Sequence, residues 1–146
     1  MILAKHVLSV YNEFMPPFFG GLPPAAIWQK TLIKYAQWED AADRNSTQAG
    51  MTSIDKHIRI IIPKNANTQG RKYIPFREFE FLPAEQKPSY WTLKINSSII
   101  CLGDTPEITS QFPSHNIKEQ FSNCLVKAIE DLTIQPILPH WEIIGI

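Results

Sequence analysis

The sequence predicts a mainly β protein, a small antiparallel β-barrel or sandwich with one short α-helix and long loops. Two observations carry this prediction. Short β-rich segments recur along the chain, and 12 prolines among its 146 residues interrupt them. Because proline fixes φ and lacks a backbone donor, long uninterrupted helices are excluded. A chain of this length can bury a substantial core, and we expect residues 1–146 to form a single domain.

The charge balance narrows the classes of function. Lysine plus arginine and aspartate plus glutamate both number 14, so the formal net charge is zero. Nonspecific binding to nucleic acid or to an anionic membrane requires an excess of positive charge. No apolar run approaches the roughly 18–20 residues of a membrane span. The composition therefore argues against a membrane partner and against nonspecific nucleic-acid binding.

Residues 15–24 form a proline-rich arm. The arm combines two proline pairs and a glycine pair with Phe18 and Phe19, a composition that favours an irregular extension. Two adjacent phenylalanines need a surface on which to pack. Either the arm packs on its own barrel, or it docks on a neighbouring subunit. The second alternative makes Phe18 and Phe19 candidate interface residues.

The next two segments predict a strand and a long loop. Residues 27–38 place Thr31, Ile33 and Tyr35 on one face at period two, although helical spacing is also partly met. Residues 39–53 are small and polar and predict a long loop, and loops of this length in compact domains are commonly functional. Three of its residues are candidate contact residues: Asp40, Asp43 and Arg44. A solvated acidic segment neutralised by Arg44 explains them more simply than a catalytic acid pair.

Residues 56–63 are the clearest strand, because isoleucines alternate with other residues up to Pro63, which ends the ladder. Residues 78–81 alternate acid with aromatic, a pattern typical of a half-buried strand. Two β-rich runs, 90–95 and 98–103, flank Asn96 and Ser97 and predict a hairpin.

The C-terminal third contains the predicted helix. Ser114 is a plausible N-cap, and apolar residues at helical spacing follow, so we expect a helix over about 115–123. The β-branched residues of 125–134 predict a return to a strand. Residues 140–146 predict a closing strand.

The sequence contains no recognisable catalytic or metal-binding motif. Cys101 and Cys124 lack metal-ligand or redox spacing and are expected to be free buried thiols. The four histidines are far apart in the sequence, and no glycine-rich phosphate loop is present. We therefore expect a protein that is not an enzyme, with no catalytic residue, metal or cofactor.

One segment favours a different class of function. Basic and aromatic residues interleave between 64 and 79, as in proteins that bind single strands by stacking and charge. Neighbouring glutamates largely offset the basic charge. A small protein-binding or single-stranded-DNA-binding module is thus an alternative; the residues concerned are Lys64, Arg71, Lys72, Tyr73, Phe76, Arg77 and Phe79.

The order of these segments resembles a family of small structural proteins, labelled minor capsid or head-tail proteins, of tailed phages and prophages of Gram-positive bacteria. The resemblance covers residues 28–146. Its most specific parts are the isoleucine strand that ends at Pro63 and the closing His140-Trp141 motif. The chain departs from the family in its proline-rich arm and in lacking a basic residue and a glycine pair after Trp141.

The resemblance implies a virion protein that is made in the host cytoplasm and placed in the neck between portal and tail. Such a head-completion protein, head-tail connector or stopper would form a homo-oligomeric ring. Its partners would be copies of itself, portal or adaptor proteins and tail proteins, with weak contact to packaged DNA. The loop over 40–53 would face the lumen or portal, and Trp141 of the closing motif is a further candidate interface residue. A tail-terminator or tail-completion ring is the alternative within the same class.

Overall fold

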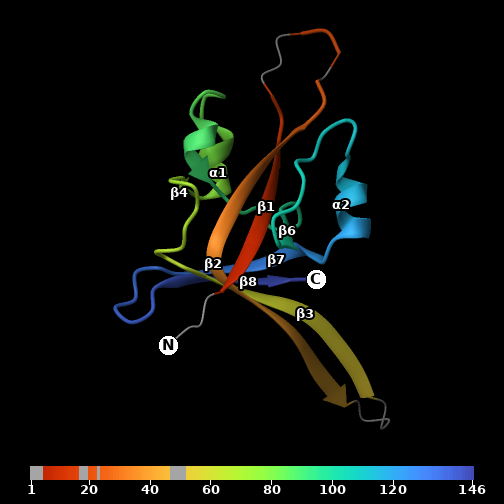
Figure 1. The fold of residues 1–146 in the computed structure, drawn as a ribbon, viewed down its shortest axis with the longest axis vertical. Coiled ribbons are helices and arrows are strands. Elements are labelled where there is room, and N and C mark those ends of the chain that lie inside the picture. The colour runs from red at the N-terminus through yellow and green to blue at the C-terminus, as the bar shows by residue number, and fades with distance from the viewer. Residues whose placement is uncertain (1–4, 17–19, 23, 47–51) are drawn as a thin grey trace.

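The protein is a barrel of antiparallel strands from which long loops, short helices and a pair of extended strands project (Figure 1). The computed structural model describes residues 5–16, 20–22, 24–46 and 52–146, the side chains of 41–46 and 52–56 excepted. Its elements in chain order are β1 (His6–Phe14), β2 (Ile27–Ser46), β3 (Thr52–Pro63), β4 (Lys72–Tyr73), α1 (Phe76–Glu80), the 3₁₀ helix η1 (Lys87–Ser89), β5 (Tyr90–Trp91), β6 (Ile99–Leu102), α2 (Ser114–Gln120), β7 (Asn123–Leu132) and β8 (His140–Gly145).

Six strands close the barrel in the order β1-β2-β3-β8-β7-β6, and β6 pairs back onto β1. Every neighbouring pair in it is antiparallel. Closure removes the sheet edges that an open sandwich would leave. The predicted small antiparallel barrel is therefore confirmed, and the sandwich alternative is not needed.

A bulge at Tyr35 lets one long strand serve two neighbours. β2 pairs with β1 up to Ala36 and with β3 from Gln37 onwards. The register with β1 shifts between His6 and Val7, where Tyr35 has φ of 69° and is left without a partner in that ladder. An extra residue in one strand bends it and increases its twist. The predicted strand over 27–38 is thus confirmed but continues much further.

The core fills the barrel from alternate strand positions. Ile60 and Ile62 of β3 and Ile143 of β8 point inward, as the period of two predicts. Trp141 lies among them and contacts Tyr73 and Trp91, with ring centroids 5.0 and 5.2 Å away. A second apolar cluster lies on the outer face of β1 and β6, where Ile117 of α2 covers it. The chain therefore buries both faces of β1 and β6.

Two local predictions were wrong. Residues 76–80 form α1 instead of the expected strand, because one turn suffices to bury Phe79 against Phe14. The runs 90–95 and 98–103 do not form a hairpin: β5 pairs in parallel with β4, whereas β6 joins the barrel. The turn between them exists, since the backbone N–H of Ser98 donates to the carbonyl of Lys94 at 3.0 Å.

The predicted C-terminal helix and strands are confirmed with shifted ends. The helix is α2, which ends at Gln120, and the apolar residues that follow it belong to β7. Ser114 is its first residue and makes no side-chain cap, because Pro113 occupies the N-cap position. The closing strand is β8. Cys101 and Cys124 are free and buried, as predicted.

The predicted loop over 39–53 is largely a pair of strands. β2 runs to Ser46 and β3 starts at Thr52, and these strands pair along their length. β8 pairs with β3 only from Ile58 onwards. On the N-terminal side of Ile58, β3 pairs only with β2, and these two strands continue as a ribbon that projects from the barrel (Figure 1). Polar composition marked this segment as solvent-exposed, but it did not exclude strand pairing.

Candidate functional site

The candidate contact residues that the structure describes, Asp40, Asp43, Arg44 and Trp141, do not converge on one site. Phe18 and Phe19 lie outside the described residues. Asp40 is exposed on β2 opposite Ile58, at the base of the projecting ribbon. Asp43 and Arg44 continue along the same strand, in the ribbon, opposite Asp55 and Ile54. Their side chains are outside the described part.

Trp141 is a core residue rather than a surface contact. Its side chain is only 8% exposed and packs between Tyr73 and Trp91 inside the barrel. On β8 it pairs with Ile62 and Asp131, which is the opposite end of that strand from Ile58. The structure therefore does not favour an interface contact through Trp141.

The projecting ribbon, residues 41–46 and 52–56, is the first surface feature with a binding capacity. It has two strand edges, one on β2 and one on β3. Within the part of the chain that the structure describes, no third strand pairs with these edges. Unpaired strand edges present backbone donors and acceptors that a strand of another chain can use.

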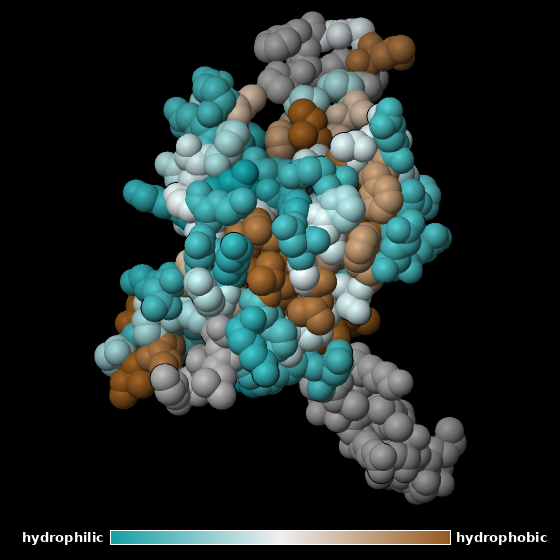
Figure 2. Space-filling model, viewed as in Figure 1, coloured by the Kyte–Doolittle hydropathy of each residue, from teal (hydrophilic) through white to brown (hydrophobic). Residues whose placement is uncertain are grey.

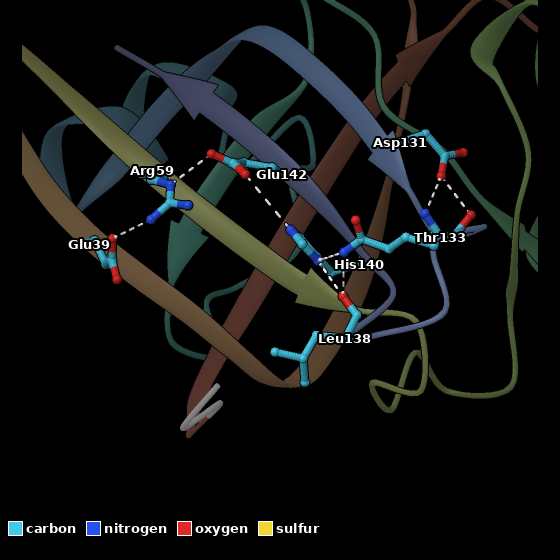
Figure 3. Close-up of polar contacts among 8 residues, drawn as sticks. Glu39, Arg59, Asp131, Thr133, Leu138, His140 and Glu142 are labelled. Carbon is cyan, nitrogen blue, oxygen red and sulfur yellow. Dashed lines mark hydrogen bonds and ion pairs between the residues drawn. The ribbon is translucent and has the colours of Figure 1, made fainter. Parts of the chain in front are cut away.

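A ladder of ionic contacts crosses β2, β3 and β8 on the outside of the barrel (Figure 3). Arg59 donates from Nε to Glu142 Oε1 at 2.7 Å and lies 3.3 Å, Nη1 to Oε2, from Glu39. The hydrogen bond to Glu142 raises the pKa of Arg59, and the same bond lowers the pKa of Glu142. His140 Nε2 lies 3.8 Å from the other oxygen of Glu142. The ladder ties the base of the ribbon to β8.

The second surface feature is the loop between β7 and β8, residues 133–139, here called the apolar loop. Ile134 and Ile137 are 95% and 75% exposed, and Leu138 is also exposed. Hydrophobic side chains gather over this loop in Figure 2. The sequence of the loop contains two prolines and no ionisable residue. That composition was the signal from which sequence reasoning could have found it.

Polar contacts hold the apolar loop in one shape (Figure 3). The carbonyl of Leu138 accepts from His140 Nδ1 at 2.6 Å and from Gln135 Nε2 at 3.0 Å. At the other end, Thr133 donates its backbone N–H and its hydroxyl to Asp131 Oδ1, at 2.9 and 2.6 Å. Leu138 has a positive φ of 51°, a conformation that persists only where the surroundings determine it. The loop is therefore preorganised.

The third feature is a groove of about 400 Å³, here called the β2 groove. Its walls are the start of β2 and the segment before α2, and they include Ala25, Ile27, Trp28, Ile108 and Pro113. Among the described residues that line it, none is ionisable. The groove thus shares with the apolar loop the lack of ionisable side chains among its described residues.

The basic and aromatic segment is not arranged for stacking on bases. Tyr73 lies against both core tryptophans, and Phe79 is fully buried. Arg71 donates from Nη1 to the carbonyl of Lys30 and to Thr31 Oγ1, at 2.7 and 2.6 Å. Lys94 lies over the ring of Phe76, 4.5 Å from its centroid. These side chains hold the barrel together, so the observation that favoured single-stranded DNA has a structural explanation.

Among the described residues, the histidine, cysteine and acidic side chains form no metal-ligating cluster, and both cysteines are buried. Burial raises the pKa of Cys101 to about 11 and that of Cys124 to about 12, which leaves both as thiols at neutral pH. No helix within the described ranges is long and apolar enough to cross a membrane.

Comparison with known proteins places the chain in a family. Residues 23–146 match a family of unknown function, DUF6751. The chain belongs to the DUF6751 family. The matched residues include the ribbon, the apolar loop and the described residues that line the β2 groove, so all three surface features lie within the DUF6751 region. No curated protein and no solved structure matches the chain.

Proposed function

We propose that the protein is a structural subunit of the neck of a tailed phage, a head-completion protein, head-tail connector or stopper that forms a homo-oligomeric ring between portal and tail. The observation that carries the proposal is the ribbon beyond Ile58, which extends β2 and β3 past the barrel and offers two strand edges. A subunit with strands that extend past its own barrel has backbone edges available for contacts with other subunits.

Two further observations support an assembly role. The apolar loop and the β2 groove expose uncharged, mostly apolar surface on a chain of zero net charge. Exposed apolar patches rimmed by polar residues mark sites of protein association. The resemblance to phage minor capsid and head-tail proteins supplies the phage context. A tail-terminator or tail-completion ring has the same requirements and differs in its position in the virion.

Quantitative mass spectrometry of purified virions from the source phage tests the proposal. We expect the chain at a ring-like copy number relative to the portal, roughly six to twelve. Absence from clean virions would overturn the structural role and favour a binding module instead.

A shortened ribbon tests the observation behind the proposal. Replacing residues 42–56 by Asn-Gly joins Ala41 to His57 through a two-residue hairpin turn and keeps all pairing between β3 and β8. We expect a folded barrel that no longer enters virions. Normal incorporation of this variant would show that the ribbon is not an assembly element.

A further inference from the structure

We propose that the apolar loop of one copy inserts into the β2 groove of a second copy, so that neighbouring subunits contact head to tail. This inference rests on the proposed ring and names the contact that would build it. It combines two features that no local requirement of the fold explains: an exposed apolar projection and an uncharged groove.

The projection is built for insertion. Ile134 and Ile137 are 95% and 75% exposed, so most of their apolar surface contributes little to the stability of their own chain. The contacts of Leu138 with Gln135 and His140 hold the loop in shape before it meets a partner. A preorganised loop loses less conformational freedom on binding than a flexible one.

The groove offers a matching surface. Its volume of about 400 Å³ is enough for a few aliphatic side chains, and the described residues that line it are uncharged. Trp28 and Ile27 provide apolar walls, and Ala25 and Ala26 leave room between them. Another cavity, of about 200 Å³, is lined by Glu13, Glu80 and Lys94 among others and is less suited to an aliphatic loop, because burying those charges would cost free energy.

The positions of the two features decide the symmetry of the contact. In Figure 1 the loop between β7 and β8 projects on one side of the barrel, and the segment before α2 lies on the other. The loop therefore does not reach the groove of its own chain. A projection and a groove on opposite sides make a heterologous contact, which leaves a second loop and groove available and closes into a ring when the rotation permits.

Two acidic variants test the contact. I134D/I137D alters the loop, and Ala25→Glu alters the groove at an exposed position, so both chains should fold. Analytical ultracentrifugation up to about 1 mM protein, which detects even weak association, measures the mass of each variant alone and of an equal mixture. Phe81→Asp is the matched control, because Phe81 is 83% exposed and lies elsewhere.

We expect the wild type and Phe81→Asp to associate with rising concentration and each acidic variant to remain at 16.7 kDa. The equal mixture should form dimers and no larger species, because the two chains together retain one intact loop and one intact groove. A contact between the loops of two copies would not produce this rescue in the mixture.

Other outcomes overturn the inference. If only the loop variant loses association, the loop binds another loop or another surface. If both variants associate as the wild type does, the ring uses different contacts, such as the ribbon. A wild-type chain that stays monomeric throughout also contradicts the inference. The copy number of the chain in virions tests the proposed function independently of these association measurements.

Discussion

Gly145 of β8 lies directly against Cys124 of β7. A Cβ at position 145 would be 2.8 Å from Cys124 Cβ, closer still to its Sγ, and 3.1 Å from the carbonyl oxygen of Leu125. The two strands approach this closely because position 145 has no side chain. Glycine is therefore required here by packing, not by an unusual φ.

Gly145→Ala should destabilise the barrel. The added methyl group overpacks the interior beside Cys124, a change that costs about 1–3 kcal/mol. Urea denaturation measures the free energy of unfolding. Ile146→Ala, one residue further at an exposed position, is the control and should leave stability unchanged. Equal free energies of unfolding for the two variants would mean that β7 and β8 can move apart to accommodate the methyl group without loss of stability.

Trp141→Ala should cost more than any surface change. Removing the indole leaves a cavity between Tyr73 and Trp91, and such truncations in a core cost about 3–5 kcal/mol. Trp141→Phe retains part of the ring contacts and should lose less. Thermal and urea unfolding of both variants measure the difference. A stable, assembly-defective Trp141→Ala protein would instead support the original expectation of an intersubunit contact.

The ion-pair ladder should make stability depend on acid pH. The bond from Arg59 lowers the pKa of Glu142 in the folded state, so its stabilisation is present above the unfolded pKa, about 4.3, and is lost as the pH falls through the lower folded pKa. Because the pair is partly exposed, we expect about 1 kcal/mol or less.

Urea midpoints of the wild type and Glu142→Gln, measured between neutral pH and about pH 3, check this dependence. The variant should be less stable at neutral pH and should lose less stability as the pH falls. Glu119→Gln on α2, away from the ladder, is the control. Parallel curves for the wild type and Glu142→Gln would show that the ladder contributes nothing.

Both cysteines should resist alkylation in the folded protein. Burial raises their pKa values to about 11 and about 12, and reaction requires an exposed thiolate. Intact-mass spectrometry after iodoacetamide treatment at neutral pH should show no adduct, and two adducts per chain in urea. Rapid labelling of the native protein would reveal opening of β6 or β7.

The sequence alone determined the features that depend on local patterns. Alternation at Ile58, Ile60 and Ile62 predicts a strand with one buried face, because successive side chains point to opposite faces. The surroundings of Cys101 and Cys124 predict burial. Proline spacing predicts short elements, and the net charge argues against nonspecific binding of polyanions. These properties need no knowledge of which segments meet.

Only the tertiary structure decided which segments pair and what they leave uncovered. The segment 78–81 is too short for its hydrophobic pattern to distinguish a strand from a helix. Burial of Phe79 against Phe14 determines that it is helical. The partners of β5 and β6 lie far away in the sequence, so the turn at Asn96 could not identify them. The composition of the apolar loop can be read from the sequence, but its exposure and the walls of the β2 groove were decided only by closure of the barrel, because exposure is set by contacts between distant segments.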